Sequence, residues 1–176
     1  MSIIAPQASA ARSLLLLLLC CAPFSGWGLT VQELRENPHL TPERFAEYFA
    51  NFKFELREEL QPRDQFLKSE AGDCDDFATL AADVLREKGY TTRLVVVFMK
   101  NDTHVVCYVK ETGAFLDYNL RRNPTGRTVP ANGQLSDIAS KVARLFHSSW
   151  NCVSEFTYAG GERKFILTDF PQVAGK

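Results

Sequence analysis

Three residue types that together perform thiol chemistry occur along the chain in the order cysteine, histidine, aspartate, at Cys74, His104 and Asp117. A cysteine can attack a carbonyl carbon when a base lies within hydrogen-bond reach and a third group orients that base. The acyl thioester that forms can then be hydrolysed by water. Because 43 positions separate the first residue from the last, the secondary-structure elements that carry them must bring them together.

Cys74 begins a stretch with helical periodicity, GDCDDFATLAADVLREKG, which ends at Gly89. Its apolar residues recur at spacings of three and four, so the cysteine heads the buried side of a predicted helix. Unpaired backbone N–H groups and the dipole at a helix N-terminus favour a thiolate and offer donors to an oxyanion. A buried structural cysteine at the head of an apolar stripe is the alternative interpretation.

Three aspartates surround the cysteine. Asp73 is placed to cap the helix, and Asp75 and Asp76 lie in its first turn, where they complement the helix dipole. Their negative charge disfavours a thiolate at Cys74, so activation of the thiol depends more strongly on contact with His104.

The histidine and the third residue of the set lie on two adjacent predicted strands. His104 and Val106 point to the same face of the first strand, because side chains alternate along a strand. A four-residue loop over 110–113 pairs Asp117 with Val106 and leaves His104 on the near diagonal, about 7 Å away. We therefore expect an Asp117 oxygen within about 3.5 Å of one His104 ring nitrogen, and the Cys74 sulfur near the other. A three-residue turn would place Asp117 on the wrong face.

The remaining segments predict helices first and strands afterwards. The stretch TTRLVVVFM, residues 91–99, is apolar throughout, as a central strand is. Helices are expected over 31–38, over 41–52 with a Thr41 cap, and over 136–146 with a Ser136 cap; a loop is expected over 120–133, and a final hairpin over 150–158 and 163–170, turned at Gly160 and Gly161, with Trp150 and Tyr158 as core aromatics. This order predicts an α+β fold, with helices packed on one face of a mostly antiparallel sheet.

Composition is that of one folded domain. The chain has 176 residues, of which 45% are hydrophobic and 23% charged. Its formal net charge of -1, without blocks of like charge, argues against DNA, RNA or an acidic membrane surface as partner. We expect a monomer.

The N-terminus predicts export. Arg12 precedes SLLLLLLCCAPF, an apolar run too short to span a bilayer and typical of a signal peptide. We interpret residues 1–28 as the signal and 29–176 as the domain of a periplasmic or secreted protein, with no transmembrane segment in the mature chain. An uncleaved anchor, or a lipid on Cys20 or Cys21, is the alternative.

The mature chain retains three cysteines, Cys74, Cys107 and Cys152, which is an odd number. In an oxidising compartment two of them could pair, and the remaining thiol is the candidate for chemistry. Cys107 points to the strand face opposite His104, so it is either a core residue or a disulfide partner of Cys152.

These motifs resemble a known family. GDCDDFATLAADVLREKGY, LVVVF, HVVCYV and FLDYN together resemble the core of bacterial transglutaminase-like cysteine peptidases, which have a papain-like Cys-His-Asp arrangement. The resemblance covers roughly residues 41–119. It implies that Cys74 is the nucleophile, His104 the base and Asp117 the acid that orients the base.

The resemblance also suggests a metal and an oxyanion donor. Acidic residues beside the cysteine look like calcium ligands in periplasmic members that trim surface adhesins, and Asp73 and Asp75 occupy those positions. Calcium prefers more oxygen ligands than these two supply, so helix capping stays open beside possible calcium, and no cofactor is required. The family often recruits a side chain upstream of the cysteine as oxyanion donor, and Gln61, Gln65 and Tyr48 are the polar candidates.

Three functions remain open on the sequence. The first is an exported thiol hydrolase that cleaves a peptide, isopeptide or amide bond. A protein-crosslinking acyltransferase would use the same residues with a lysine amine in place of water. A non-catalytic protein-binding module could keep the fold alone.

Overall fold

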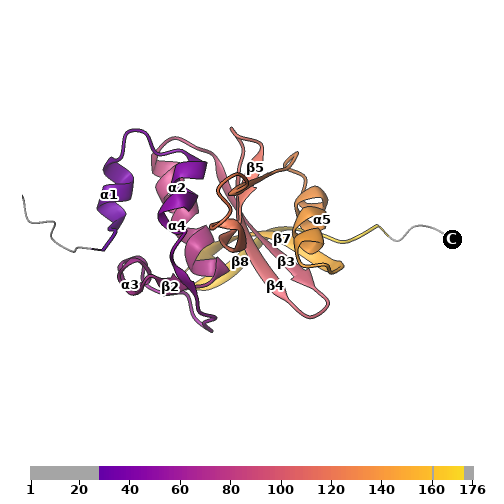
Figure 1. Cartoon of the computed structure of the whole chain (residues 1–176). Coiled ribbons are helices and arrows are strands. Elements are labelled where there is room, and N and C mark those ends of the chain that lie inside the picture. The colour runs from indigo at the N-terminus through magenta and orange to yellow at the C-terminus, as the bar shows by residue number, and fades with distance from the viewer. Residues whose placement is uncertain (1–27, 160, 173–176) are drawn as a thin grey trace, which may run out of the picture.

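The computed structural model describes residues 28–159 and 161–172. Figure 1 shows a sheet with α1 to α4 gathered on one side and α5 on the other. The helices are α1 (Val31–Glu36), α2 (Pro42–Tyr48), α3 (Arg63–Ser69), α4 (Cys74–Glu87), a 3-10 helix η1 (Tyr118–Leu120) and α5 (Leu135–Leu145). The strands are β1 (Lys53–Phe54), β2 (Ala71–Gly72), β3 (Thr92–Met99), β4 (Thr103–Val109), β5 (Ala114–Leu116), β6 (Thr128–Pro130), β7 (Trp150–Ala159) and β8 (Glu162–Asp169).

The main sheet has six strands in the order β6-β5-β4-β3-β7-β8, and every neighbouring pair is antiparallel. The predicted α+β class with a mostly antiparallel sheet is confirmed. β3 pairs with β4 on one side and β7 on the other, so the uniformly apolar segment is the central strand, as expected. A short parallel pair of β1 and β2 lies directly before α4.

The core on the α4 side is aromatic. Phenylalanine rings from α2, α3 and α4 meet there, with Phe49 stacked on Phe66 at 5.6 Å and edge-on to Phe77 at 5.2 Å. Tyr118 of η1 packs against Phe77 at 5.3 Å. This cluster holds the first turn of α4 against the segment that follows β5, which is where the candidate residues lie.

Helix α5 corrects the expectation that helices cover one face only. The β3 and β4 strands are apolar on both faces, and α5 packs on the second face over Val97, Val106 and Val153. Two local expectations were also wrong. The N-cap position of α5 is Gln134, without a side-chain cap, and Ser136 lies inside the first turn. The segment over 120–133 contains β6 because Thr128 and Val129 pair with β5.

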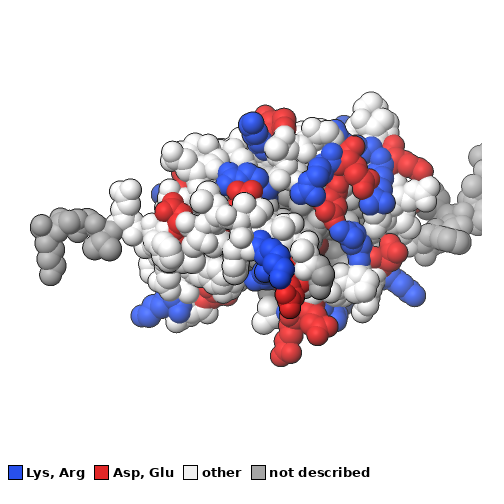
Figure 2. Space-filling view, turned by 180° about the vertical axis from the view of Figure 1, so that it is seen from behind, with Lys and Arg blue, Asp and Glu red and all other residues white. Residues whose placement is uncertain are grey.

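The charges on the described surface are mixed in sign. Acidic and basic side chains lie interspersed on the face shown in Figure 2, and neither sign covers it. No described helix combines the length and hydropathy that crossing a membrane requires. The predicted signal peptide, residues 1–28, lies outside the described residues except for Gly28.

Candidate active site

The N-terminus of α4 is organised by the aspartates around Cys74. Asp73 is the N-cap, and its carboxylate accepts hydrogen bonds from the N–H groups of Asp75 at 2.9 Å and Asp76 at 3.4 Å. Asp76 completes a capping box, because its carboxylate accepts from the Asp73 N–H at 3.2 Å. The capping role predicted for Asp73 is confirmed.

Both capping carboxylates also hold the loop that follows β1. The Arg57 N–H donates to Asp73 at 3.0 Å, and the Gln61 N–H donates to Asp76 at 2.8 Å. The Gln61 side chain adds a second bond to Asp76 at 2.7 Å. The aspartates therefore fix residues 57–61 beside the N-terminus of α4, in addition to capping the helix.

Gly72, the residue before the cap, has no room for a side chain. A Cβ at this position would lie 2.7 Å from the ring of Phe66 and 2.5 Å from the carboxylate of Asp76. Both neighbours are buried, so neither can move away cheaply. The glycine of the Gly-Asp-Cys motif is needed for steric reasons.

Substitution of this glycine should therefore destabilise the fold. We expect Gly72→Ala to lower the free energy of unfolding by about 1–3 kcal/mol, the usual cost of overpacking a filled core. Chemical denaturation measures it. Gly126→Ala is the control, since the three atoms nearest to its Cβ would all belong to the exposed Asn123 side chain. Equal stability of the two variants would contradict the steric account.

The β4–β5 hairpin has the register on which the expected contact depends. Val109 pairs with Ala114 and Cys107 with Leu116, so the loop is the four residues 110–113. The same register places Asp117, one residue past β5, opposite Val106. His104 Nε2 and Asp117 Oδ1 lie 2.8 Å apart, within the expected 3.5 Å. The register prediction is confirmed.

His104 and Asp117 are both withdrawn from water, with 3% and 1% of their surface exposed. Phe146, the residue after α5, covers the imidazole with ring centroids 4.7 Å apart. Burial lowers the pKa of His104, but the charge and hydrogen bond of Asp117, together with a hydrogen bond to Cys74, outweigh it and raise the pKa to about 10. The imidazole is therefore held as an imidazolium between a carboxylate and the sulfur.

The structure thus brings the three predicted residues into one cluster. Asp117 bonds to Nε2 of His104, which leaves Nδ1 as the ring nitrogen that can face Cys74. Cys74 is 9% exposed at the first position of α4. A sulfur, a charged imidazole and a carboxylate in this order can activate a nucleophile and move its proton.

The structure supports none of the three candidate side chains as the oxyanion donor. The Gln61 amide nitrogen is occupied, because it donates to Asp76 and to the Ala71 carbonyl at 3.1 Å. Tyr48 accepts a hydrogen bond from Asn37 and lines a surface pocket with Asn37, Arg44 and Glu47. Gln65 is exposed on α3.

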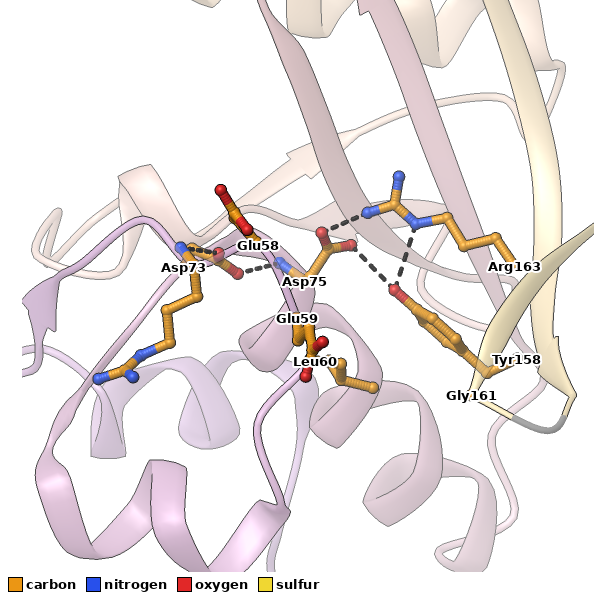
Figure 3. Close-up of a pocket in the computed structure, with 9 residues that line it drawn as sticks. Glu58, Glu59, Leu60, Asp73, Asp75, Tyr158, Gly161 and Arg163 are labelled. Carbon is orange, nitrogen blue, oxygen red and sulfur yellow. Dashed lines mark hydrogen bonds and ion pairs between the residues drawn. The ribbon is translucent and has the colours of Figure 1, made fainter.

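An acidic pocket of about 560 Å³ opens beside Cys74, and Figure 3 shows its lining. Asp73 and Asp75 reach it from α4, and Tyr158 and Arg163 reach it from the β7–β8 hairpin. Glu58 and Glu59 come from the loop after β1. Asp73, Cys74 and Asp75 place their ligand-type atoms within 4.8 Å of one another.

This lining does not fit a calcium ion as it stands. Asp75 is ion-paired with Arg163, and its other oxygen accepts from the Tyr158 hydroxyl at 3.5 Å. Both oxygens of Asp73 accept backbone N–H groups. Calcium takes six to eight oxygen ligands, and a guanidinium beside these carboxylates would repel it. The possible calcium at Asp73 and Asp75 therefore lacks a suitable ligand set.

Tyr158 and Arg163 were missed as site residues on the sequence. Tyr158 was expected in the core, but it is half-buried and accepts from Arg163 Nε at 3.2 Å while donating to Asp75. The alternation of side chains along the strand predicts which face Tyr158 lies on, but it does not predict its hydrogen-bond partners. The sequence signal was the hairpin predicted over 150–158 and 163–170, and in the structure Tyr158 and Arg163 pair opposite each other on β7 and β8.

Cys107 and Cys152 are both free. Cys107 pairs with Leu94 on one side of β3 and Cys152 with Phe98 on the other side. They are therefore two strands apart, which is too far for a disulfide. Cys107 is fully buried in the α4-side core, and burial raises the pKa of its thiol to about 12.

Comparison with known proteins identifies the family. None of the curated proteins compared with the chain matches it. Among solved structures, calcium-bound LapG of Legionella pneumophila is similar at 18% identity, covering 57% of this chain and 67% of that chain with a TM-score of 0.42. The family model for the transglutaminase-like superfamily matches residues 30–157, which include all three clustered residues. The chain belongs to the transglutaminase-like superfamily.

Proposed function

We propose that this protein is an exported thiol hydrolase that cleaves an amide bond of a protein or peptide through Cys74, His104 and Asp117. The observation that carries the proposal is the 2.8 Å contact between His104 and Asp117, with the imidazolium beside a cysteine at a helix N-terminus. Membership of the transglutaminase-like superfamily supports it. Export rests on the predicted signal in residues 1–28.

The reaction has two halves. With its proton already on His104, the Cys74 sulfur attacks the carbonyl carbon, and the C–S bond forms as the carbonyl electrons move to oxygen. When the intermediate collapses, the C–N bond breaks and His104 gives its proton to the leaving amine. Water then attacks the thioester, His104 takes a proton from that water, and the carboxylic acid leaves as the sulfur is released.

The oxyanion needs donors, and the backbone supplies one. The Asp73 cap uses the N–H groups of Asp75 and Asp76 and does not use that of Cys74. The Cys74 N–H at the positive end of α4 is therefore the donor that the chain offers to the developing charge.

Selective alkylation tests the proposal directly. Iodoacetamide at pH 7 should label Cys74 in the folded protein far faster than Cys107 or Cys152, as followed by peptide mass spectrometry. Cys107 is buried with a raised pKa, whereas Cys152 is half-buried and serves as the comparison. Equal rates at all three thiols would remove the catalytic role of Cys74.

A second measurement separates hydrolysis from transamidation. A glutamine-containing peptide is incubated with the protein in the presence and absence of a lysine-like primary amine. We expect free carboxylate as the main product even with the amine present. Preferential incorporation of the amine would make the protein an acyltransferase, and the absence of both products from a panel of amide and isopeptide substrates would favour a binding module.

A further inference from the structure

The carboxylates beside Cys74 are paired with a cation from another part of the fold. Arg163 lies at the start of β8, and its guanidinium forms an ion pair with Asp75 of α4. Tyr158 on the neighbouring strand contacts both partners, because its hydroxyl accepts from Arg163 and donates to Asp75. Figure 3 shows the three side chains converging from the helix and the hairpin.

The arginine is held in place independently of the carboxylate. Its guanidinium carbon lies 5.3 Å from the ring centroid of Phe156, and Tyr158 packs against Phe156 at 5.5 Å. The Arg163 side chain is 28% exposed, and that of Asp75 is 21% exposed. A partly desolvated pair with fixed geometry interacts more strongly than an exposed surface pair.

The pocket lining is rich in carboxylates, and Arg57, its other cation, is paired with Glu55. Asp73 and Asp75 lie close together, and Glu58 and Glu59 also line the pocket. Burial raises the pKa of Asp75 more strongly than the charge of Arg163 lowers it. Without a nearby positive charge, these carboxylates would repel one another and would disfavour a thiolate at Cys74.

We propose that Arg163 takes the place of a divalent cation in this protein. Its guanidinium neutralises the Asp73–Asp75 pair and fastens the β7–β8 hairpin to the N-terminus of α4, so that the protein keeps Cys74 in position without calcium. Arg163 is a positioning residue in this account. It touches neither the sulfur nor the imidazole, and it acts through Asp75.

The test compares variants of the folded protein with and without metal. Arg163→Gln removes the charge, Arg163→Lys restores a cation, and Lys164→Gln is the matched control, since Lys164 is the next residue of the strand and pairs only with exposed Glu162. Melting temperatures are recorded in EDTA and in excess calcium chloride. Because this readout needs no catalysis, its outcome is independent of the proposed hydrolase activity.

We expect the wild-type melting temperature to be the same in EDTA and in calcium. R163Q should melt about 2–4 °C lower than K164Q in EDTA, the shift that loss of one modest interaction produces in a protein of this size, with R163K in between. In an Asp75→Asn background, R163Q should lower the melting temperature much less, because the Asp75 charge that Arg163 neutralises is absent.

Three results would overturn the inference. A calcium-dependent rise in the wild-type melting temperature would show that the ion binds despite Arg163. Equal melting of R163Q and K164Q in EDTA, or an R163Q loss that Asp75→Asn leaves undiminished, would show that Arg163 does not serve the carboxylates of α4.

Discussion

Replacement of His104 by alanine should slow alkylation of Cys74 at pH 7 by about 10²–10⁴-fold, the range that a positioned acid–base group contributes. The substitution removes the imidazolium that pairs with the sulfur, while the three aspartates around Cys74 remain. Hydrolysis of any substrate identified should fall by at least the same factor, since the leaving amine also loses its proton donor. Stopped-flow alkylation with mass-spectrometric assignment of the site measures the first effect.

A second variant distinguishes loss of the base from a folding defect. In the alanine variant, Asp117 would be a buried carboxylate without its partner, and such a charge is strongly destabilising. His104→Gln keeps an N–H group that can donate to Asp117 but supplies no base. We expect it to fold and to be as slow as the alanine variant. His39→Ala, at an exposed histidine, is the control and should react like wild type. Unchanged alkylation in folded His104→Gln would mean that another group activates Cys74.

The parts of the site that could be predicted from the sequence depend on local geometry. Alternation of side chains, with the loop length 110–113, is enough to place Asp117 beside His104, and the observed register agrees. The cap at Asp73 follows from its position directly before an amphipathic stretch, and the structure shows that cap. Each inference spans fewer than about twenty residues, over which the chain has few alternative arrangements.

The parts that could not be predicted depend on contacts between distant segments. Arg163 and Asp75 are 88 positions apart, and no periodicity connects a β8 arginine with the first turn of α4. The Gln61 side chain looked like a free donor because the sequence does not show that Asp76, 15 positions later, occupies its amide. A polar side chain's partner is set by the packing of whole elements, whereas its face is set by its own strand or helix.

The position of α5 is an intermediate case. Apolar residues on both faces of β3 and β4 require two covering layers, so a second helical layer could have been predicted from the sequence. The prediction of helices on one face overlooked this requirement. The same helix end brings Phe146 onto His104, a contact that requires the second layer.

Replacement of Asp117 should have the second-largest effect on the thiol. Asp117→Ala removes both the acceptor for Nε2 and the charge that holds the imidazolium, so we expect alkylation of Cys74 at pH 7 to slow by about 10²-fold. Asp117→Asn should lose less, because its amide oxygen can still accept the ring N–H and the N–H of Asn119. Asp102→Asn, in the exposed turn before β4, is the control. If both Asp117 variants react like wild type, the carboxylate does not orient His104.

The Asp117 charge should also appear in the pH dependence of stability. The pKa of His104 is raised from 6.5 to about 10 in the folded protein, so its protonation stabilises the fold fully below about pH 6.5, and this contribution is lost as the pH rises through about 10. In Asp117→Asn the charge that raises the pKa is gone, and burial, which lowers it, should dominate. The wild type should therefore exceed Asp117→Asn in free energy of unfolding by the largest margin near pH 6, and the margin should shrink steadily toward pH 10. Urea denaturation of both proteins across this range measures the margin, and groups that titrate equally in both, such as Cys107 and Tyr118, cancel in the difference. A margin that is constant from pH 6 to 10 would show that Asp117 does not hold His104 in its charged form, and the description of His104 as an imidazolium would fail with it.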